Sequence, residues 1–213
     1  MALFYVLFTW VLPGFIGGLG PITGFFKETK VPQTPISENP NLAPPVLNIP
    51  YEATNSAKIS ITGFAAAHST VKVYLDDNLV KETESDENGS FTIKDVELVL
   101  GTNNIYGISE DEKGTDSLPS KTIKIIYDNE NPLLEISEPP DNHTVSGERK
   151  LTVAGKTEAS ATVAINGEQA IVDSEGKFNR QFNLTDGTNT FTIVSKDSAG
   201  NTSTVARNVT FNP

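Results

Sequence analysis

Residues 173–201 read DSEGKFNRQFNLTDGTNTFTIVSKDSAGN, and residues 86–115 read DENGSFTIKDVELVLGTNNIYGISEDEKGT. Both stretches carry an Asp-x-x-Gly-x-Phe run, a Gly-Thr-Asn run and a second Asp-x-x-Gly run, at an offset of 86 or 87 residues. Further upstream, residues 71–73 match residues 163–165 at an offset of 92, so one loop is shorter in the second copy. An internal repeat of this period indicates that one folding unit occurs twice.

Alternating segments between turn residues predict short strands in both copies. Apolar residues recur at every second position, which is typical of strands with one buried and one wet face. Asp77-Asn78 and Asn166-Gly167 have the composition of two-residue hairpin turns. Turns this short predict antiparallel pairing throughout, and no amphipathic helix is predicted after residue 30. The predicted strands are 58–63, 70–75, 90–93, 103–108 and 121–126 in the first copy, and 150–154, 161–165, 177–182, 190–194 and 204–211 in the second.

This pattern predicts an all-β chain with two tandem immunoglobulin-like β-sandwiches. Six or seven short strands in about 80 residues are typical of that fold. The sandwiches are expected to follow an N-terminal membrane helix and a Pro-rich linker. The predicted parts are a hydrophobic membrane anchor at 1–26, a linker at 27–45, a first immunoglobulin-like module at 46–128 and a second at 129–213.

The order of the turn motifs resembles that of bacterial immunoglobulin-like modules found in tandem on cell-surface proteins, in particular the glucodextranase B-domain-like set. The motifs of the second copy are residues 173–178, 184–189 and 197–201, and the first copy departs with Thr115 where the second has Asn201. The resemblance covers residues 46–213. It implies a fold and a surface location. It does not indicate an activity, because such modules serve as spacers, adhesins and accessory domains alike.

Residues 2–26 carry no charged side chain, and they include Trp10, the only Trp of the protein. As a helix this segment would span about 37 Å, enough for a hydrocarbon core of about 30 Å. Lys27 and Lys30 follow it as interfacial anchors often do. We interpret it as a retained membrane anchor, kinked at Pro13-Gly14. A cleaved signal peptide and a piece of a larger membrane region remain alternatives, and the charges leave the topology open.

The segment after the anchor, residues 27–45, contains five prolines and little apolar content. Such a composition favours an extended, semi-stiff spacer. A spacer of this kind would hold the folded modules away from a surface.

The composition argues against nucleic-acid binding and most enzyme chemistry. The net charge is −11, from 27 acidic and 16 basic side chains, whereas phosphate binding needs clustered Lys and Arg. The absence of Cys removes disulfides and thiol catalysis. His68 and His143 are the only imidazoles, and they fall in different modules without triad or metal-ligand spacing. We therefore expect no enzyme activity, no catalytic, cofactor-binding or metal-binding residues, and no cofactor.

Several acidic clusters are candidate sites. A glycosidase would need two carboxylates facing each other across a cleft, but these clusters fall at expected strand ends and turns, so a solvated face is the prediction. Between the modules, residues 128–132 have the oxygen ligands to hold Ca²⁺, although a solvated hinge is favoured. Residues 197–201 are expected to form a turn that binds its own backbone rather than a cation. The clusters are Asp76-Asp77, Glu82, Glu84, Asp86-Glu87 and Glu110-Asp111-Glu112.

Aromatic residues confine any carbohydrate platform to the first module. The tyrosines that remain after the anchor all lie there, whereas the second module has only phenylalanines, at positions expected to face inward. The tyrosines are Tyr51, Tyr74, Tyr106 and Tyr127, and the phenylalanines are Phe178, Phe182, Phe191 and Phe211.

The sequence thus predicts a non-enzymatic, membrane-anchored bacterial surface protein, located outside the cytoplasm, that acts as a spacer, display or adhesion module. The alternative is an accessory carbohydrate- or cell-wall-binding module of a glycan-active system. The expected partners are the membrane, through residues 2–26, and a surface protein or glycan, with no nucleic acid. The identity of the partner and the oligomeric state stay open.

Overall fold

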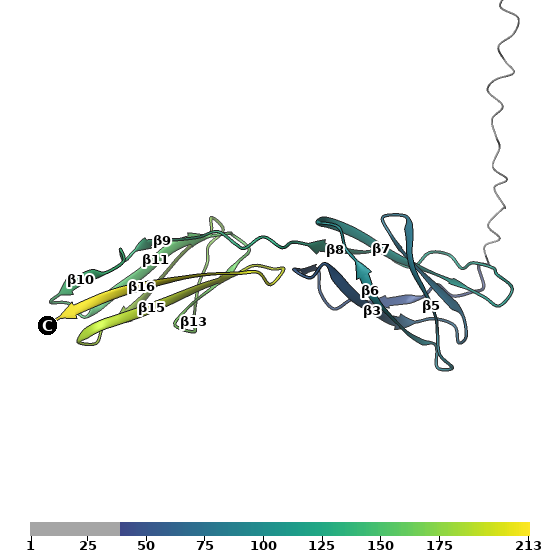
Figure 1. The fold of residues 1–213 in the computed structure, drawn as a ribbon, viewed down its shortest axis with the longest axis horizontal. Helices are drawn as coiled ribbons and strands as arrows, with labels where there is room; N and C mark the ends of the chain where they lie inside the picture. Colours follow the sequence, from purple (N-terminus) through teal and green to yellow (C-terminus); the bar gives the residue numbers. More distant parts are fainter. Residues whose placement is uncertain (1–38) are drawn as a thin grey trace, which may run out of the picture. The chain divides into compact units, whose positions relative to one another are not determined.

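In the computed structural model, which describes residues 39–213, the strands form two sandwiches, β1–β8 and β9–β16 (Figure 1). The predicted membrane anchor and most of the predicted linker lie outside the described residues. Within residues 39–213 all named elements are strands, as predicted. No helix in this part of the chain has the length and hydropathy to cross a bilayer.

The first sandwich, called module 1 below, packs a three-stranded sheet against a five-stranded sheet. The three-stranded sheet has the order β1 (Val46–Asn48), β3 (Lys58–Phe64) and β6 (Ser90–Glu97). The five-stranded sheet has the order β2 (Ala53–Thr54), β8 (Ile123–Tyr127), β7 (Gly101–Glu110), β4 (Thr70–Leu75) and β5 (Asn78–Glu84). Alternate residues of both sheets meet in one core, in which Ile61, Val73 and Ile125 are fully buried.

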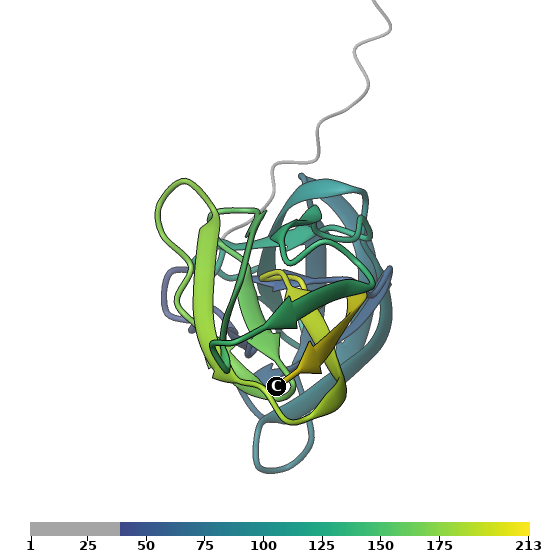
Figure 2. The same cartoon turned by 90° about the vertical axis from the view of Figure 1, so that its left-hand side faces the viewer.

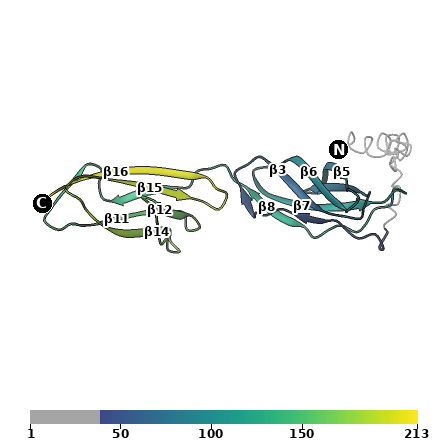
Figure 3. The same cartoon turned by 90° about the horizontal axis from the view of Figure 1, so that it is seen from below.

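The second sandwich, module 2, repeats this plan with a core of its own, centred on Val153, Ile193 and Val209. Figure 3 shows β15 and β16 in one layer and β11 and β14 in the other, and the chain ends after β16 (Figure 2). Burial of each such side chain stabilises the fold by about 1.5–3 kcal/mol. The three-stranded sheet has the order β14 (Lys177–Asn183), β11 (Lys150–Thr157) and β9 (Leu134–Glu138), and the five-stranded sheet has the order β10 (His143–Ser146), β16 (Thr202–Asn212), β15 (Gly187–Lys196), β12 (Thr162–Ile165) and β13 (Glu168–Ala170).

The prediction of antiparallel pairing throughout was wrong at one edge of each module. β2 runs parallel to β8, with Ala53 opposite Ile126, and β10 runs parallel to β16, with His143 opposite Val209. The cause is the same in both modules. The chain enters in the three-stranded sheet and then switches to the five-stranded sheet, where it meets the last strand of the module. Because these partners are far apart in sequence, a rule based on turn length does not apply to them.

Residues 39–45, the last part of the predicted linker, contact module 1. The backbone N–H of Asn39 donates to the carbonyl of Asp116 at 2.8 Å, and Pro45 is buried. The segment therefore has fixed contacts before β1 begins.

Candidate functional site

The aspartates of the repeated turns accept hydrogen bonds from the backbone of their own turns. Each carboxylate accepts hydrogen bonds from two backbone N–H groups within the next four residues, at 2.7–2.9 Å. The hydrogen bond from the Thr115 amide is the main cause that holds the pKa of Asp111 below its ordinary value. These four carboxylates therefore shape turns, as the sequence predicted for residues 197–201. They are Asp86, Asp111, Asp173 and Asp197.

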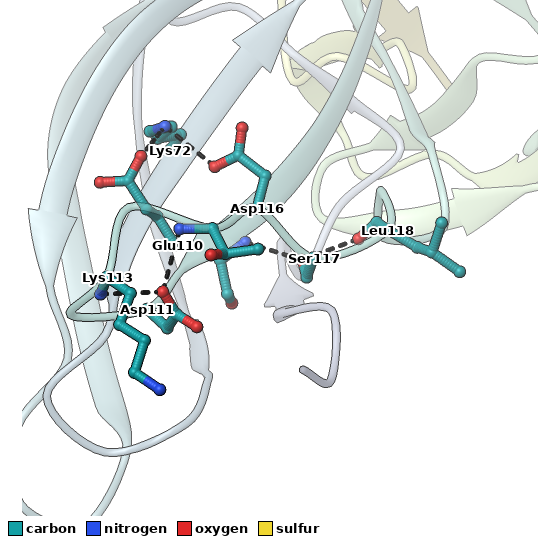
Figure 4. Close-up of polar contacts among 9 residues, drawn as sticks. Lys72, Glu110, Asp111, Lys113, Asp116, Ser117 and Leu118 are labelled. Carbon is teal, nitrogen blue, oxygen red and sulfur yellow. Dashed lines mark hydrogen bonds and ion pairs between the residues drawn. The ribbon is translucent and has the colours of Figure 1, made fainter. Parts of the chain in front are cut away.

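A lysine and two carboxylates meet on the wet face of module 1 (Figure 4). Lys72 on β4 pairs with Glu110 at the end of β7 and, at 3.0 Å, with Asp116 in the following loop. The three side chains are 17%, 29% and 18% exposed. Burial alone would lower the pKa of Lys72, but hydrogen bonds to Glu110 and Asp116 outweigh it and raise that pKa. The charged ammonium thus ties β4 to β7 and its loop.

The two histidines lie apart. His68 is an exposed turn residue with a φ of 56°, and His143 is an exposed residue at the start of β10. Residues 39–213 contain no group of three or more His, Asp and Glu side chains placed to hold a metal ion.

The segment that joins the modules contacts module 2 through hydrogen bonds that sequence reasoning missed. The Asn201 amide, which is 7% exposed, donates from Nδ2 to the carbonyl of Asp128 at 3.0 Å and to Asp197 Oδ2 at 2.9 Å. Ser203 Oγ donates to the carbonyl of Pro132 at 2.6 Å. The signal in the sequence was a departure between the turn motifs of the two copies, because module 1 has Thr115 at the position of Asn201.

Two of the predicted tyrosines come together on the wet face of the five-stranded sheet of module 1. Tyr74 on β4 and Tyr106 on β7 lie opposite each other and stack with ring centroids 5.1 Å apart and an interplanar angle of 4°. The Tyr106 hydroxyl donates to Asp77 Oδ1 at 3.3 Å. Burial, followed by the Asp77 charge, raises the pKa of Tyr106. Tyr51 and Tyr127 instead pack partly against the core.

Module 2 lacks this tyrosine pair. By strand register, Asn166 and Thr192 occupy the corresponding positions, and the Thr192 amide donates to Asn166 Oδ1 at 2.7 Å. The phenylalanines of module 2 face inward as predicted. Phe178, Phe191 and Phe211 are buried, and Phe182 is half-buried against the same core.

Comparisons with known proteins agree with this architecture. Residues 132–212 match the family model described as glucodextranase, domain B. Bacillopeptidase F of Bacillus subtilis (strain 168) is 28% identical over 153 residues, which are 71% of this chain and 10% of that protein. The fibronectin(III)-like modules of Clostridium thermocellum CbhA superpose with a TM-score of 0.55 at 14% identity, over 79% of this chain and 94% of theirs.

The chain therefore spans about a tenth of the length of Bacillopeptidase F. The likeness to the CbhA modules is one of fold alone. Together with the internal repeat, these findings confirm that the chain contains tandem immunoglobulin-like modules.

Proposed function

We propose that this chain is a non-enzymatic bacterial surface protein, held at the membrane by residues 2–26, whose modules space and present binding surfaces outside the cytoplasm. The observation that carries the proposal is the use of polar groups. The repeated aspartates bind their own turns, and Lys72 is paired with Glu110 and Asp116. Groups used in this way stabilise a framework and are not free to react with a substrate.

The comparisons support a modular role without assigning a partner. The matching family describes one domain of glucodextranase, and the match to Bacillopeptidase F covers a small part of that protein. In both cases the likeness is to a portion of a larger protein, which is how spacer and binding modules occur.

Protease treatment of intact cells tests the location. A bacterium that expresses the full chain should lose residues 46–213 to external protease, while a cytoplasmic marker survives. Replacing Val6 and Val11 by Asp should release the chain from the membrane fraction, because charges in the hydrocarbon core are costly. The control places Asp at Val31 and Ile36, outside the anchor. Full protection of residues 46–213 until the cells are lysed would refute the proposal.

An accessory glycan-binding role is the second candidate, and the Tyr74–Tyr106 pair is the observation that favours it. Aromatic rings on a wet sheet face are suited to pack against sugar rings. Affinity electrophoresis of the full chain in gels containing soluble polysaccharides tests this role. Tyr74→Ala with Tyr106→Ala should abolish any retardation. The control is Phe64→Ala, which removes an exposed aromatic from the other sheet. Retardation that the tyrosine variant leaves unchanged would exclude the pair as a sugar platform.

A further inference from the structure

Module 1 has an open groove beside β8, which we call the edge groove. It is lined by residues 49–52 on one side and by residues 121–124 and Ile126 on the other, with a volume of about 810 Å³. The groove exists because the chain switches sheets between β1 and β2. On the edge of β8 that faces away from β7, only the C-terminal end is paired. There the Ile126 and Asp128 amides donate to the carbonyls of Glu52 and Thr54.

The backbone of Lys124 points into this groove. Lys124 lies opposite Asn104 on β7, but the N–H and carbonyl of Asn104 bind Asp76 on the other side of β7. The Asn104–Lys124 pair therefore exchanges no ladder hydrogen bonds, so the N–H and carbonyl of Lys124 face away from β7, like those of Ile126. By the same alternation Thr122 also faces outward. Among residues 39–213 these backbone groups have no partner, so the edge groove offers them to an added strand.

Module 2 has the corresponding backbone position occupied by a carboxylate. Asn208 on β16 has the register position of Lys124, because each lies opposite the residue that follows the shared Gly-Thr-Asn run. The Asn208 amide donates to Oδ1 of Asp141, in the segment between β9 and β10, at 3.1 Å. Module 1 has Pro50 at the position of Asp141, and within residues 39–213 no side-chain carboxylate accepts a hydrogen bond from the Lys124 amide.

The side chains of the edge groove fit an acidic occupant. Lys121 and Lys124 are exposed, and neither forms an ion pair within residues 39–213. Glu52 is the one acid of the lining. Ile49 and Tyr51 supply an apolar wall that packs on the core, and Ile126 is 41% exposed. Two exposed lysines that have no acidic partner in the described part of the chain favour a ligand that carries carboxylates.

We infer that the edge groove is a docking site for an extended, acidic segment of another polypeptide, which adds as a strand to β8. A backbone carbonyl of the added strand accepts from the Lys124 N–H, as the Asp141 side chain does from the N–H of Asn208. The carboxylates of the added strand pair with the Lys121 and Lys124 ammonium groups, and its alternate apolar side chains contact Ile49 and Tyr51. Main-chain pairing supplies the affinity, and the lysines supply the selectivity for acidic sequences. The inference names a partner class for the surface role proposed above and rests on that role only for its cellular setting.

A model peptide tests the inference on the purified full chain. The probe is an acetylated peptide of about eight residues that alternates Val and Glu, with a Val–Lys peptide as its counterpart. Calorimetry should detect the Val–Glu peptide and not the Val–Lys peptide, and amide NMR shifts should centre on residues 121–126. Equal binding of both peptides, or shifts elsewhere, would overturn the inference whether or not the protein is found at the cell surface.

Matched variants separate charge from backbone pairing. Lys121→Glu with Lys124→Glu should weaken Val–Glu binding by at least about tenfold, whereas Lys94→Glu, an exposed charge reversal on β6, should not. Lys124→Pro should weaken binding more than Lys124→Ala, because it also removes the outward N–H while an edge strand tolerates proline. Equal effects of Pro and Ala would exclude strand addition. Self-association of the chain that Lys124→Pro abolishes would instead identify a second copy as the occupant and overturn the assignment to another polypeptide.

Discussion

At the scale of single residues, the repeated turns explain why their glycines recur. Gly89 and Gly176 have φ of 77° and 80°, and a Cβ at these positions would lie 2.3 Å from the carbonyl oxygen of Ala65 and 1.9 Å from that of Thr157. Their own carbonyls accept from the amides of the same two residues at 2.8 Å. The backbone of each turn thus packs closely against the end of a neighbouring strand. The Asp-x-x-Gly pattern alone did not predict this contact.

Gly176→Ala should therefore destabilise the chain far more than Gly114→Ala. Gly114 has a similar φ of 76°, but nothing lies within 4 Å of its added Cβ. Backbone conformation alone should cost Gly114→Ala about 1–2 kcal/mol, and the clash should bring Gly176→Ala to at least about 3 kcal/mol. Urea unfolding of the module that carries each change measures both values. Equal losses would mean that the close contact is relieved by a small backbone shift.

Asp111 gives a pH dependence whose sign follows from its lowered pKa. Its ordinary value is 3.8, and backbone hydrogen bonding lowers it in the folded state. The folded state therefore binds the proton less readily than the unfolded state. Its contribution to stability is complete above pH 3.8 and is lost as the pH falls through the lowered value.

Asp111→Asn should consequently flatten the acid limb of the stability curve. Melting temperatures between about pH 2 and pH 6 give the measurement, with Glu112→Gln as the control from the same turn. The Asn variant should lose less stability on acidification than the parent, and the Gln variant should follow the parent. Parallel curves for Asp111→Asn and the parent would contradict the assignment.

At the scale of elements, alternation predicted the strands that have one face in a core, and it failed for β1, β2 and the exposed edge strand β5. β3, β4, β7 and β15 follow the period of two because one face of each lies in a core. β5 pairs with a neighbouring strand on one side only and is largely exposed. Its sequence, NLVKETE, therefore shows little alternation of apolar and polar residues. β1 and β2 are too short for a period to be read.

The edge groove could not be predicted from the sequence. It depends on which strand lies beside β8 and on where that pairing stops. Neither can be read from the residues of β8, because the partner segment is far away in the sequence. The tyrosine pair was partly predictable: the sequence placed the tyrosines in module 1, but the register of β4 against β7 decides that two of them stack.

Asn201→Thr should loosen the segment between the modules, because Thr cannot reach both Asp128 and Asp197 as the amide does. Loss of a buried hydrogen-bonding side chain of this kind costs about 1–3 kcal/mol. Hydrogen exchange at the amides of residues 128–131 should become faster while the core strands of module 1 keep their protection. Asn179→Thr, an exposed change on β14, is the control. Unchanged exchange at residues 128–131 would show that the hydrogen bonds of Asn201 do not hold the segment.

At the scale of the whole molecule, the two cores share no residue. One contains Ile61, Val73 and Ile125, and the other contains Val153, Ile193 and Val209. Each sandwich also closes its own two sheets, with no strand exchanged between them. We therefore expect each module to have its own free energy of unfolding.

Ile61→Ala should accordingly destabilise module 1 by about 2–5 kcal/mol and leave module 2 unaffected. Ile193→Ala is the matched change in module 2, because both side chains are fully buried. NMR of the full chain during urea unfolding follows the two sets of core resonances separately. A common midpoint that shifts in both variants would reveal one cooperative unit.

The parallel pairs β2–β8 and β10–β16 have a mechanical consequence. In each module they join the strand near the point of entry to the last strand, so tension on the chain ends loads their hydrogen bonds in shear. All bonds of such a patch must then rupture together, which resists force better than unzipping. The patch has four residue pairs in module 2 and two in module 1. Module 1 should therefore yield first under load, and a strand seated beside Lys124 would reinforce the weaker clamp.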